Sequence, residues 1–342
     1  MDDDRPSPTA DRLLGLEAPS EPTPSPAERV DELACAPADV RKTTIRSLRD
    51  RVDAAPDAAA ALLPLLSTFL TDEERAVRLS TAKLFVAVAS ERPAAAEPTV
   101  SALAERLADE DEFYFVRARA AEALGYVALA SPDVVANPET IADLTIGLAF
   151  DEEAVRRKLA KALEHVAIGD PARLTHHVET LAEHVDDECE LVRYHCCTAL
   201  AAIACEQSAA VAPVVDDLVD RFEVEPRDDE GAYVAGRVAE ALGILARADD
   251  VSVGVPELID GTADAFEESF AADRIEFATS ASDAADVGGD ATPSRIGTIE
   301  GIHATTGDAV EAMTAPAEAC PNCGIARPPQ GPPVCPGCGG PL

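Results

Sequence analysis

Apolar and small residues recur along this chain with the period of an amphipathic helix, inside a phrase of thirteen residues that is repeated. Five clear copies, spaced 39, 39, 37 and 42 residues apart, begin at Val77, Val116, Val155, Val192 and Val234. A weaker copy occupies residues 40–52. The apolar or small residues stand at positions 1, 5 or 6, 9, 12 and 13 of the phrase. Because one face of an α-helix has this spacing, each copy predicts an amphipathic helix.

A second helical pattern lies between the copies, with prolines early in it: Pro98, Pro138, Pro171, Pro213 and Pro256. Proline is tolerated in the first turn of a helix, where its missing N–H has no helical partner. Each unit is therefore predicted to be a first helix, an acidic turn and a second helix that carries the phrase. Self-similarity at this period is typical of a solenoid. We expect an all-α fold, an α-solenoid of about six helix pairs, with Pro256–Phe270 as a last first helix.

The units resemble the HEAT family, in particular the short HEAT-like repeats first named for phycobilisome lyases, over about residues 28–270. Val-Arg opens the second helix, and an acidic residue precedes the arginine by six positions. The pairs, which resemble the family's Asp–Arg ladder, are Asp72 with Arg78, Asp111 with Arg117 and Asp187 with Arg193. The last copy departs from this pattern because it has Ala235 at the arginine position. The resemblance implies that the second helices line the concave side of the solenoid.

Composition divides the rest of the chain. Residues 1–27 hold six prolines without apolar periodicity, which predicts a disordered arm. The solenoid with its capping helix is expected over 28–277. Residues 278–318 have the composition of a flexible linker, in which 294–313 are compatible with a short helix. A compact module is expected over 319–342.

The last module contains two CxxC pairs separated by eleven residues: Cys320, Cys323, Cys335 and Cys338. Two thiolates two residues apart can reach one ion, and a glycine after each pair permits the tight turn. Four such ligands suit tetrahedral zinc, so we expect Zn²⁺. The module resembles the short zinc ribbons of prokaryotic proteins, with a closed and non-catalytic metal site. Two roles stay open, a structural zinc that folds the tail and a module that docks on a partner.

Cys196 and Cys197 occupy phrase positions where other copies have small core residues, and Cys205 lies on the same helical face. Buried free cysteine commonly acts as a small hydrophobe, which favours a core role. With Cys189, His184 and His195 nearby in sequence, a second metal site is the less favoured alternative.

The net charge of −36, with 64 acidic and 28 basic residues, bears on the environment of the protein. A hydrophobic content of 47% and clear periodicity argue against general disorder. We expect an acidic surface adapted to a halophilic cytoplasm, because such a surface keeps a protein soluble in concentrated salt. The sequence shows no signal peptide or membrane span, so we expect a cytoplasmic protein.

Basic residues gather in the phrases, which hold fifteen of them against four acidic residues. The arginines at position 2 are expected to pair with the acidic turn before them or with a neighbouring repeat. The others are candidates for a basic stripe that binds a partner: Arg119, Arg157, Lys158, Lys161 and Arg237.

The histidines form none of the His-Glu pairs by which HEAT-like proteins resembling deoxyhypusine hydroxylase bind iron. The chain also lacks a Gly-rich phosphate loop, a nucleophile elbow and HExxH. We therefore predict a non-catalytic scaffold that docks a protein partner on the concave face of the second helices, with the tethered zinc ribbon as a second contact. A nucleic-acid-associated protein that uses the stripe and the ribbon is the alternative, and a lyase-type enzyme is a lesser one.

Overall fold

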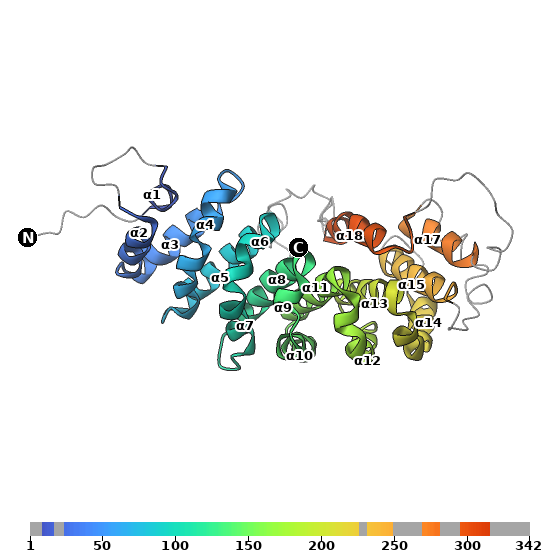
Figure 1. Ribbon diagram of the computed structural model, residues 1–342. Coiled ribbons are helices and arrows are strands. Elements are labelled where there is room, and N and C mark those ends of the chain that lie inside the picture. Colours follow the sequence, from blue (N-terminus) through green and yellow to red (C-terminus); the bar gives the residue numbers. More distant parts are fainter. Residues whose placement is uncertain (1–8, 17–23, 226–230, 249–268, 281–294, 315–342) are drawn as a thin grey trace, which may run out of the picture.

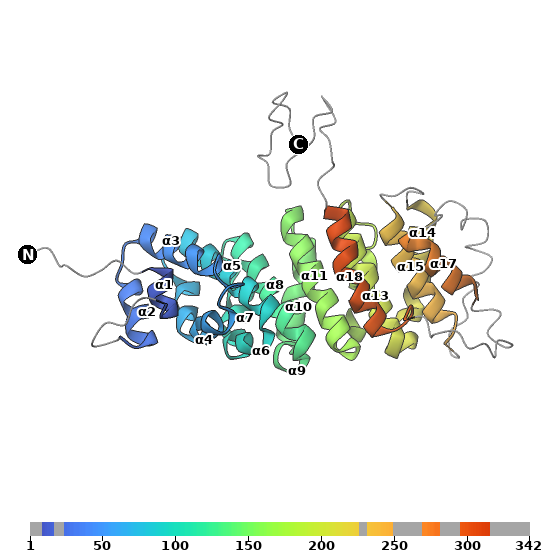
Figure 2. The same ribbon diagram turned by 90° about the horizontal axis from the view of Figure 1, so that it is seen from above.

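The computed structural model describes residues 9–16, 24–225, 231–248, 269–280 and 295–314. Their helices pack side by side in an elongated array (Figure 1; Figure 2), and these residues contain no β-strand. Each copy of the phrase lies on a second helix, namely α3 (Ala38–Arg49), α5 (Arg75–Glu91), α8 (Tyr114–Ala130), α11 (Glu153–Gly169), α13 (Glu190–Val211) and α15 (Ala232–Leu245). The predicted helical repeat solenoid is confirmed.

The first helices precede these: α2 (Pro26–Ala34), α4 (Pro56–Leu66), α7 (Val100–Ala108), α10 (Pro138–Ile146), α12 (Val178–Glu183) and α14 (Val215–Val224). Two short helices, α6 (Pro93–Ala96) and α9 (Pro132–Val135), join successive units. Further short 3₁₀ segments span Ser67–Thr71, Glu97–Thr99, Gly147–Ala149, Pro171–His177 and Ala212–Val214. In Figure 1, α7, α10, α12 and α14 lie along one edge of the array, which leaves the second helices on the other.

Prolines mark the entry to the first helices, as predicted. Pro138 is the first residue of α10, where its lack of an N–H costs no hydrogen bond. Pro98, Pro171 and Pro213 lie in the 3₁₀ segments that lead into α7, α12 and α14. Pro256 is outside the described residues.

Small residues let the second helices approach closely. A Cβ added to Gly125 of α8 would lie 2.7 Å from the Cα of Ala162 in α11, so no larger side chain fits there without a shift. Around this contact the apolar positions of the phrase, such as Val116 and Leu124, are fully buried. The core is thus a continuous layer between neighbouring repeats, because no single repeat buries its apolar face alone.

The N-terminal region is more ordered than its composition suggested. Helix α1 (Ala10–Leu14) is capped by Thr9 and packs against α2 and α3, with Leu13 1% exposed. The first repeat begins at Pro26, where Ser25 and Glu28 form a capping box. The prediction of a disordered arm over residues 1–27 is therefore wrong for these segments, because Leu13 and Leu14 supply an apolar face.

Two helices follow the last phrase. Helix α17 (Phe270–Thr279) packs along α15 in the place of the next second helix, while most of the capping helix predicted at Pro256–Phe270 lies outside the described residues. Helix α18 (Ile299–Thr314) confirms the helix expected within 294–313. It is not linker, however, since it packs alongside α13 and α11 (Figure 2), with Ile302 and Ala309 buried.

One described helical segment, Glu190–Val224, is long and apolar enough to cross a membrane. It consists of α13, the following 3₁₀ turn and α14, and half of its most apolar window is buried in the protein. Val192, Leu200 and Ile203 are fully buried between neighbouring helices. Its apolar composition is accounted for by its place in the core.

Candidate binding surface

Arginines at position 2 of the phrase connect each repeat to the next. Each guanidinium binds a carboxylate in the acidic turn of the following repeat. The pairs are Arg41–Asp72, Arg78–Glu112, Arg156–Asp187 and Arg193–Glu225, with nitrogen–oxygen distances of 2.7, 2.7, 2.8 and 3.0 Å. Both expected contacts are observed: the ion pair is with the neighbouring repeat, and Arg78, Arg156 and Arg193 also donate to backbone carbonyls of the turn before them.

The six-residue spacing of acidic residue and arginine seen in the sequence corresponds to a hydrogen bond to the backbone, not to an ion pair. Arg78 donates a hydrogen bond of 2.8 Å to the backbone carbonyl of Asp72, whose carboxylate binds Arg41 of the preceding repeat. Arg193 contacts the backbone carbonyl of Asp187 in the same way, at 2.9 Å. The members of these two spaced pairs therefore belong to successive rungs of one ladder, whereas in the third pair Arg117 donates to the Leu107 carbonyl and Glu112, not Asp111, binds Arg78.

One rung of the ladder uses an aromatic ring. The turn before α11 has Phe150 where the turns before α5, α8 and α13 supply a carboxylate to the preceding arginine. Arg117 lies 5.0 Å over the centroid of the Phe150 ring and donates to the carbonyl of Leu107 at 2.8 Å. A cation–π contact thus takes the place of the ion pair.

Three of the predicted stripe residues converge on one carboxylate. Glu122 of α8 is 4% exposed and lies 2.7 Å from Arg119 Nη1, 2.8 Å from Lys158 Nζ and 3.7 Å from Lys161 Nζ. Lys161 also donates to the Tyr126 hydroxyl at 2.6 Å. Burial raises the pKa of Glu122, but Lys158 and the other two cations outweigh burial and leave this pKa below its ordinary value.

Lys83 of α5 extends the cluster toward the N-terminus. It is half-buried and forms no ion pair with any described residue, and its charged neighbours include Arg119, Arg49 and Arg46. Burial and these positive charges lower the pKa of Lys83. We call Lys83, Arg119, Lys158 and Lys161 the basic patch; with Glu122 it combines four cations and one carboxylate.

Arg157 lies apart from the patch. Its nearest carboxylate is Glu153 of the same helix, at 3.8 Å, and its side chain is 38% exposed. Such an exposed pair is weak, so Arg157 remains a surface charge beside the patch rather than a member of the Glu122 cluster.

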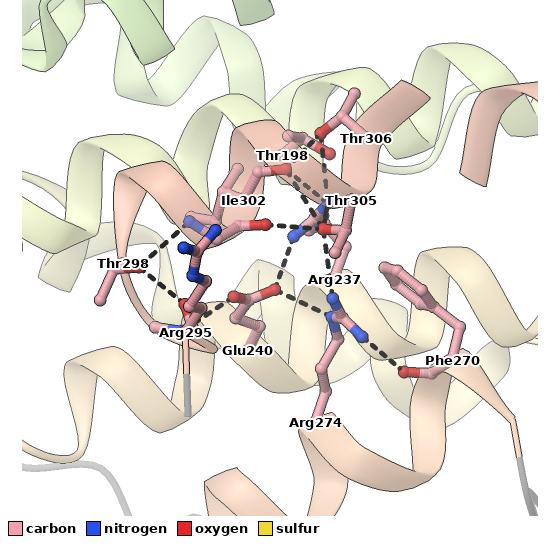
Figure 3. Close-up of polar contacts among 12 residues, drawn as sticks. Thr198, Arg237, Glu240, Phe270, Arg274, Arg295, Thr298, Ile302, Thr305 and Thr306 are labelled. Carbon is pink, nitrogen blue, oxygen red and sulfur yellow. Dashed lines mark hydrogen bonds and ion pairs between the residues drawn. The ribbon is translucent and has the colours of Figure 1, made fainter. Parts of the chain in front are cut away.

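Arg237 corrects the predicted stripe, because it is a core residue. Its side chain is fully buried and binds Glu240 at 2.6 Å and the Tyr194 hydroxyl at 3.0 Å. It also donates to the Ile302 carbonyl and to the Thr305 and Thr306 hydroxyls of α18, at 3.0 to 3.2 Å (Figure 3). Helix α18 covers this arginine, so it is not available on the open surface.

Sequence reasoning missed the docking of α18 and of α17 around Glu240. Arg274 of α17 binds Glu240 at 3.0 Å (Figure 3). The backbone N–H of Gly297 donates to the same carboxylate at 2.9 Å. A signal was present in the helical spacing of Ile299, Ile302 and Thr306, continued by Ala309 and Met313.

The cysteines divide between the described and the remaining residues. Cys320, Cys323, Cys335 and Cys338 lie outside the described residues, so their zinc site stays a prediction. Cys196 and Cys197 are fully buried, as expected for core residues, and burial raises the pKa of Cys197 to about 12. Within the described ranges no group of three His, Cys, Asp or Glu side chains could hold a metal ion.

Comparison with protein-family models and with curated proteins finds no match. Among solved structures the chain is similar to an engineered protein, with 21% identity and a TM-score of 0.56 over 65% of this chain and 99% of that one. A designed armadillo repeat protein is 19% identical, with a TM-score of 0.51 over 64% and 99% of the two chains. A computationally designed armadillo repeat protein for modular peptide recognition is 19% identical, with a TM-score of 0.50 over 62% and 97%. At these identities the likeness concerns the fold, a helical repeat solenoid.

Proposed function

We propose that the protein is a non-catalytic scaffold whose second-helix face binds an acidic segment of a protein partner at the basic patch. The observation that carries the proposal is Lys83, a half-buried cation that forms no ion pair with any described residue and whose pKa is lowered by burial and by nearby arginines. An unpaired charge removed from water is costly. A carboxylate from a partner would relieve this cost and the repulsion from Arg119.

Charge distribution supports an acidic partner. The chain has a net charge of −36, yet the patch concentrates cations on one face of α5, α8 and α11. Complementary charge contributes chiefly to the choice of partner and to the association rate. A patch of opposite sign to the rest of the molecule would also fix where on the solenoid the partner binds.

The molecule provides its own example of a segment bound to this face. Helix α18 comes from outside the array and packs on α11 and α13 through buried apolar residues, and Arg237 of α15 donates hydrogen bonds to it. The second helices therefore form a surface able to hold a helical segment. The similar armadillo design was made for peptide recognition, which supports a polypeptide as the ligand.

We further propose that a zinc ribbon formed by Cys320, Cys323, Cys335 and Cys338 provides a second contact. The proposal rests on the spacing of the two CxxC pairs. We expect the purified chain to contain about one zinc ion, as is usual for four such ligands. Metal analysis of the Cys335→Ser variant should show loss of this zinc, whereas Cys35→Ser, at an exposed free cysteine, should retain it.

Binding of defined ligands to the full chain tests the patch. Fluorescence anisotropy would compare an oligoglutamate peptide, an oligolysine peptide and a single-stranded oligouridylate across a series of salt concentrations. We expect oligoglutamate to bind and oligolysine not to bind. Lys83→Glu should weaken oligoglutamate binding by about tenfold, equivalent to about 1.4 kcal/mol.

The matched control is Arg92→Glu, which makes the same type of charge change at a side chain 46% exposed and paired with Asp57. It should leave oligoglutamate binding close to that of the unmodified protein. If the oligouridylate binds more tightly than oligoglutamate, with a steep dependence on salt, a nucleic-acid function would replace the proposal. Equal effects of the two substitutions would show that the patch is not the binding surface.

A further inference from the structure

A cavity of about 460 Å³ lies where α18 packs on the second-helix face. Its walls come from α8, α11, α13 and α18, and they include Tyr126, His165, His195, His303 and Gly307. This volume falls in the range of small-molecule sites, roughly 300–1,000 Å³. The cavity touches the basic patch only through Lys161, whose ammonium group is already held by Tyr126 and Glu122.

Two buried acceptor atoms on α11 have no partner in this cavity wall. Glu164 is fully buried; one carboxylate oxygen accepts from His195 Nδ1 at 2.8 Å, while Oε1 has no hydrogen-bond partner. The adjacent His165 is 7% exposed, and its Nδ1 also has no partner. Buried polar atoms in native proteins are nearly always hydrogen-bonded, so two adjacent exceptions point to a ligand that donates.

The protonation states of both groups fit a donor. Burial raises the pKa of Glu164, but His195 and, less strongly, His165 and Arg237 outweigh burial and lower this pKa, so the carboxylate is ionised. Burial lowers the pKa of His165 to about 4, so the ring is neutral near pH 7 and one of its nitrogens can accept. In the described part of the chain these side chains do not form a group able to hold a metal ion.

The rest of the wall is suited to an apolar body. Leu129 of α8, Ile168 of α11 and Val310 of α18 line the cavity. We propose that this cavity binds a small organic amine, whose ammonium group donates to Glu164 Oε1 and His165 Nδ1 and whose hydrocarbon part packs against these three residues. The ligand lies beneath α18, so the chain's own helix forms part of the site.

Calorimetric titration of the full chain with three probes of equal chain length tests the assignment: n-hexylamine, n-hexanol and n-hexanoate. We expect binding of hexylamine alone. Glu164→Gln keeps the size of the side chain but removes its charge. It should weaken hexylamine binding by about ten- to a hundredfold, because a hydrogen bond to a charged acceptor is lost.

A second variant blocks the cavity without changing the buried pair. A Cβ added to Gly307 of α18 meets no atom within 4 Å, so this wall position has room for a side chain. Gly307→Phe should fill the cavity and abolish hexylamine binding, whereas Gly307→Ala should preserve it. This variant keeps the test decisive even if Glu164→Gln fails to fold.

Three outcomes would overturn the assignment. Absence of hexylamine binding would mean that only water satisfies the two acceptors. Equal binding of hexanol would identify an apolar cavity without selectivity for an amine, and preferred binding of hexanoate would place the ligand on Lys161 and His303 instead. None of these results bears on the acidic segment proposed for the basic patch, which is tested by Lys83→Glu.

Discussion

Glu122 and Glu240 occupy the same position of the phrase, and each has an arginine three residues before it. Arg119 binds Glu122 at 2.7 Å and Arg237 binds Glu240 at 2.6 Å, so the two local pairs are nearly identical. The side chain of Arg119 is nevertheless 31% exposed, while that of Arg237 is fully buried. What differs is the cover, since α18 lies over the second pair.

The comparison shows that one repeat motif yields either a surface charge or a core charge, according to what packs on it. On the open side, Glu122 gathers lysines from the next repeat and leaves a positive surface. On the covered side, Glu240 is shared by Arg237 and Arg274, and Arg237 also donates hydrogen bonds to α18 and to the Tyr194 hydroxyl. The Arg119–Glu122 pair therefore stays partly exposed to solvent, whereas the Arg237–Glu240 pair does not.

The largest expected effect on the free energy of unfolding comes from removing the arginine of the buried pair, and the exposed pair provides the comparison. Arg237→Ala leaves the buried network of Glu240 and Tyr194 incomplete and should destabilise the fold by about 3–5 kcal/mol, as for other buried pairs that lose one partner. Arg119→Ala should cost less than about 1 kcal/mol, because its side chain is partly solvated and Lys158 still binds Glu122. Denaturant unfolding followed by circular dichroism measures both. Similar losses in the two variants would contradict the assigned difference in burial.

Local periodicity predicted the helices and much of the core, because positions such as Val116 and Leu124 obey the helical spacing that burial requires. It could not assign the ladder partners. The Asp72 and Arg78 spacing is local, whereas the ion pair of Asp72 joins it to Arg41, 31 residues earlier. Spacing within one helix does not say which repeat a side chain reaches.

The candidate surface was predicted only in part for the same reason. Arg119, Lys158 and Lys161 do converge, because their positions face one side of neighbouring second helices. Arg237 had the same local signature, but its environment is set by Ile302, 65 residues away. A contact at that separation depends on where an apolar helix outside the repeat pattern docks, which the periodicity does not encode.

A further difference between repeats lies at position 11 of the phrase, which is Tyr126 in α8 and His165 in α11. Because His165 titrates, it makes the stability of the fold depend on pH. The folded state keeps His165 neutral down to about pH 4, while the unfolded chain takes up a proton near pH 6.5. The unfolded state therefore binds more protons between these values, and stability falls as the pH is lowered through this window. The expected loss is about 3 kcal/mol, at about 1.36 kcal/mol per pKa unit.

The carboxylates titrate in the unmodified protein and in His165→Gln alike, so the difference between their stability profiles is the contribution of His165. Unfolding free energies at several pH values should show a shallower decline for the variant. His176→Gln, at an exposed position, should follow the unmodified protein. Parallel profiles for all three proteins would mean that His165 is not shielded beneath α18.

Close packing is expected to contribute equally where α8 meets α11, in the uncovered part of the array, and where α15 meets α17, in the covered part. Gly125 and Gly243 share position 10 of the phrase, and an added Cβ would lie 2.7 Å from the Cα of Ala162 or 2.9 Å from that of Ala278. Alanine at either site must push two helices apart, which should cost about 1–3 kcal/mol in each variant. Thermal unfolding tests this expectation. A loss confined to Gly243→Ala would indicate that the repeats near α8 adjust more freely than those beneath α17 and α18.

The smallest effect concerns α18 itself, the element that separates the two halves. Gly307 is exposed and has open space around it, so Gly307→Ala should stabilise the helix by about 0.5–1 kcal/mol. Gly301 is the opposite case in the same helix, because an added Cβ would collide with the backbone carbonyl of Arg295. Hydrogen exchange of the α18 amides should become slower in Gly307→Ala and faster in Gly301→Ala. Since Arg237 is buried only while α18 is docked, hydrogen exchange of the amides near Arg237 should change in the same direction as that of α18 in each variant. Unchanged exchange near Arg237 in both variants would contradict the dependence of its burial on α18.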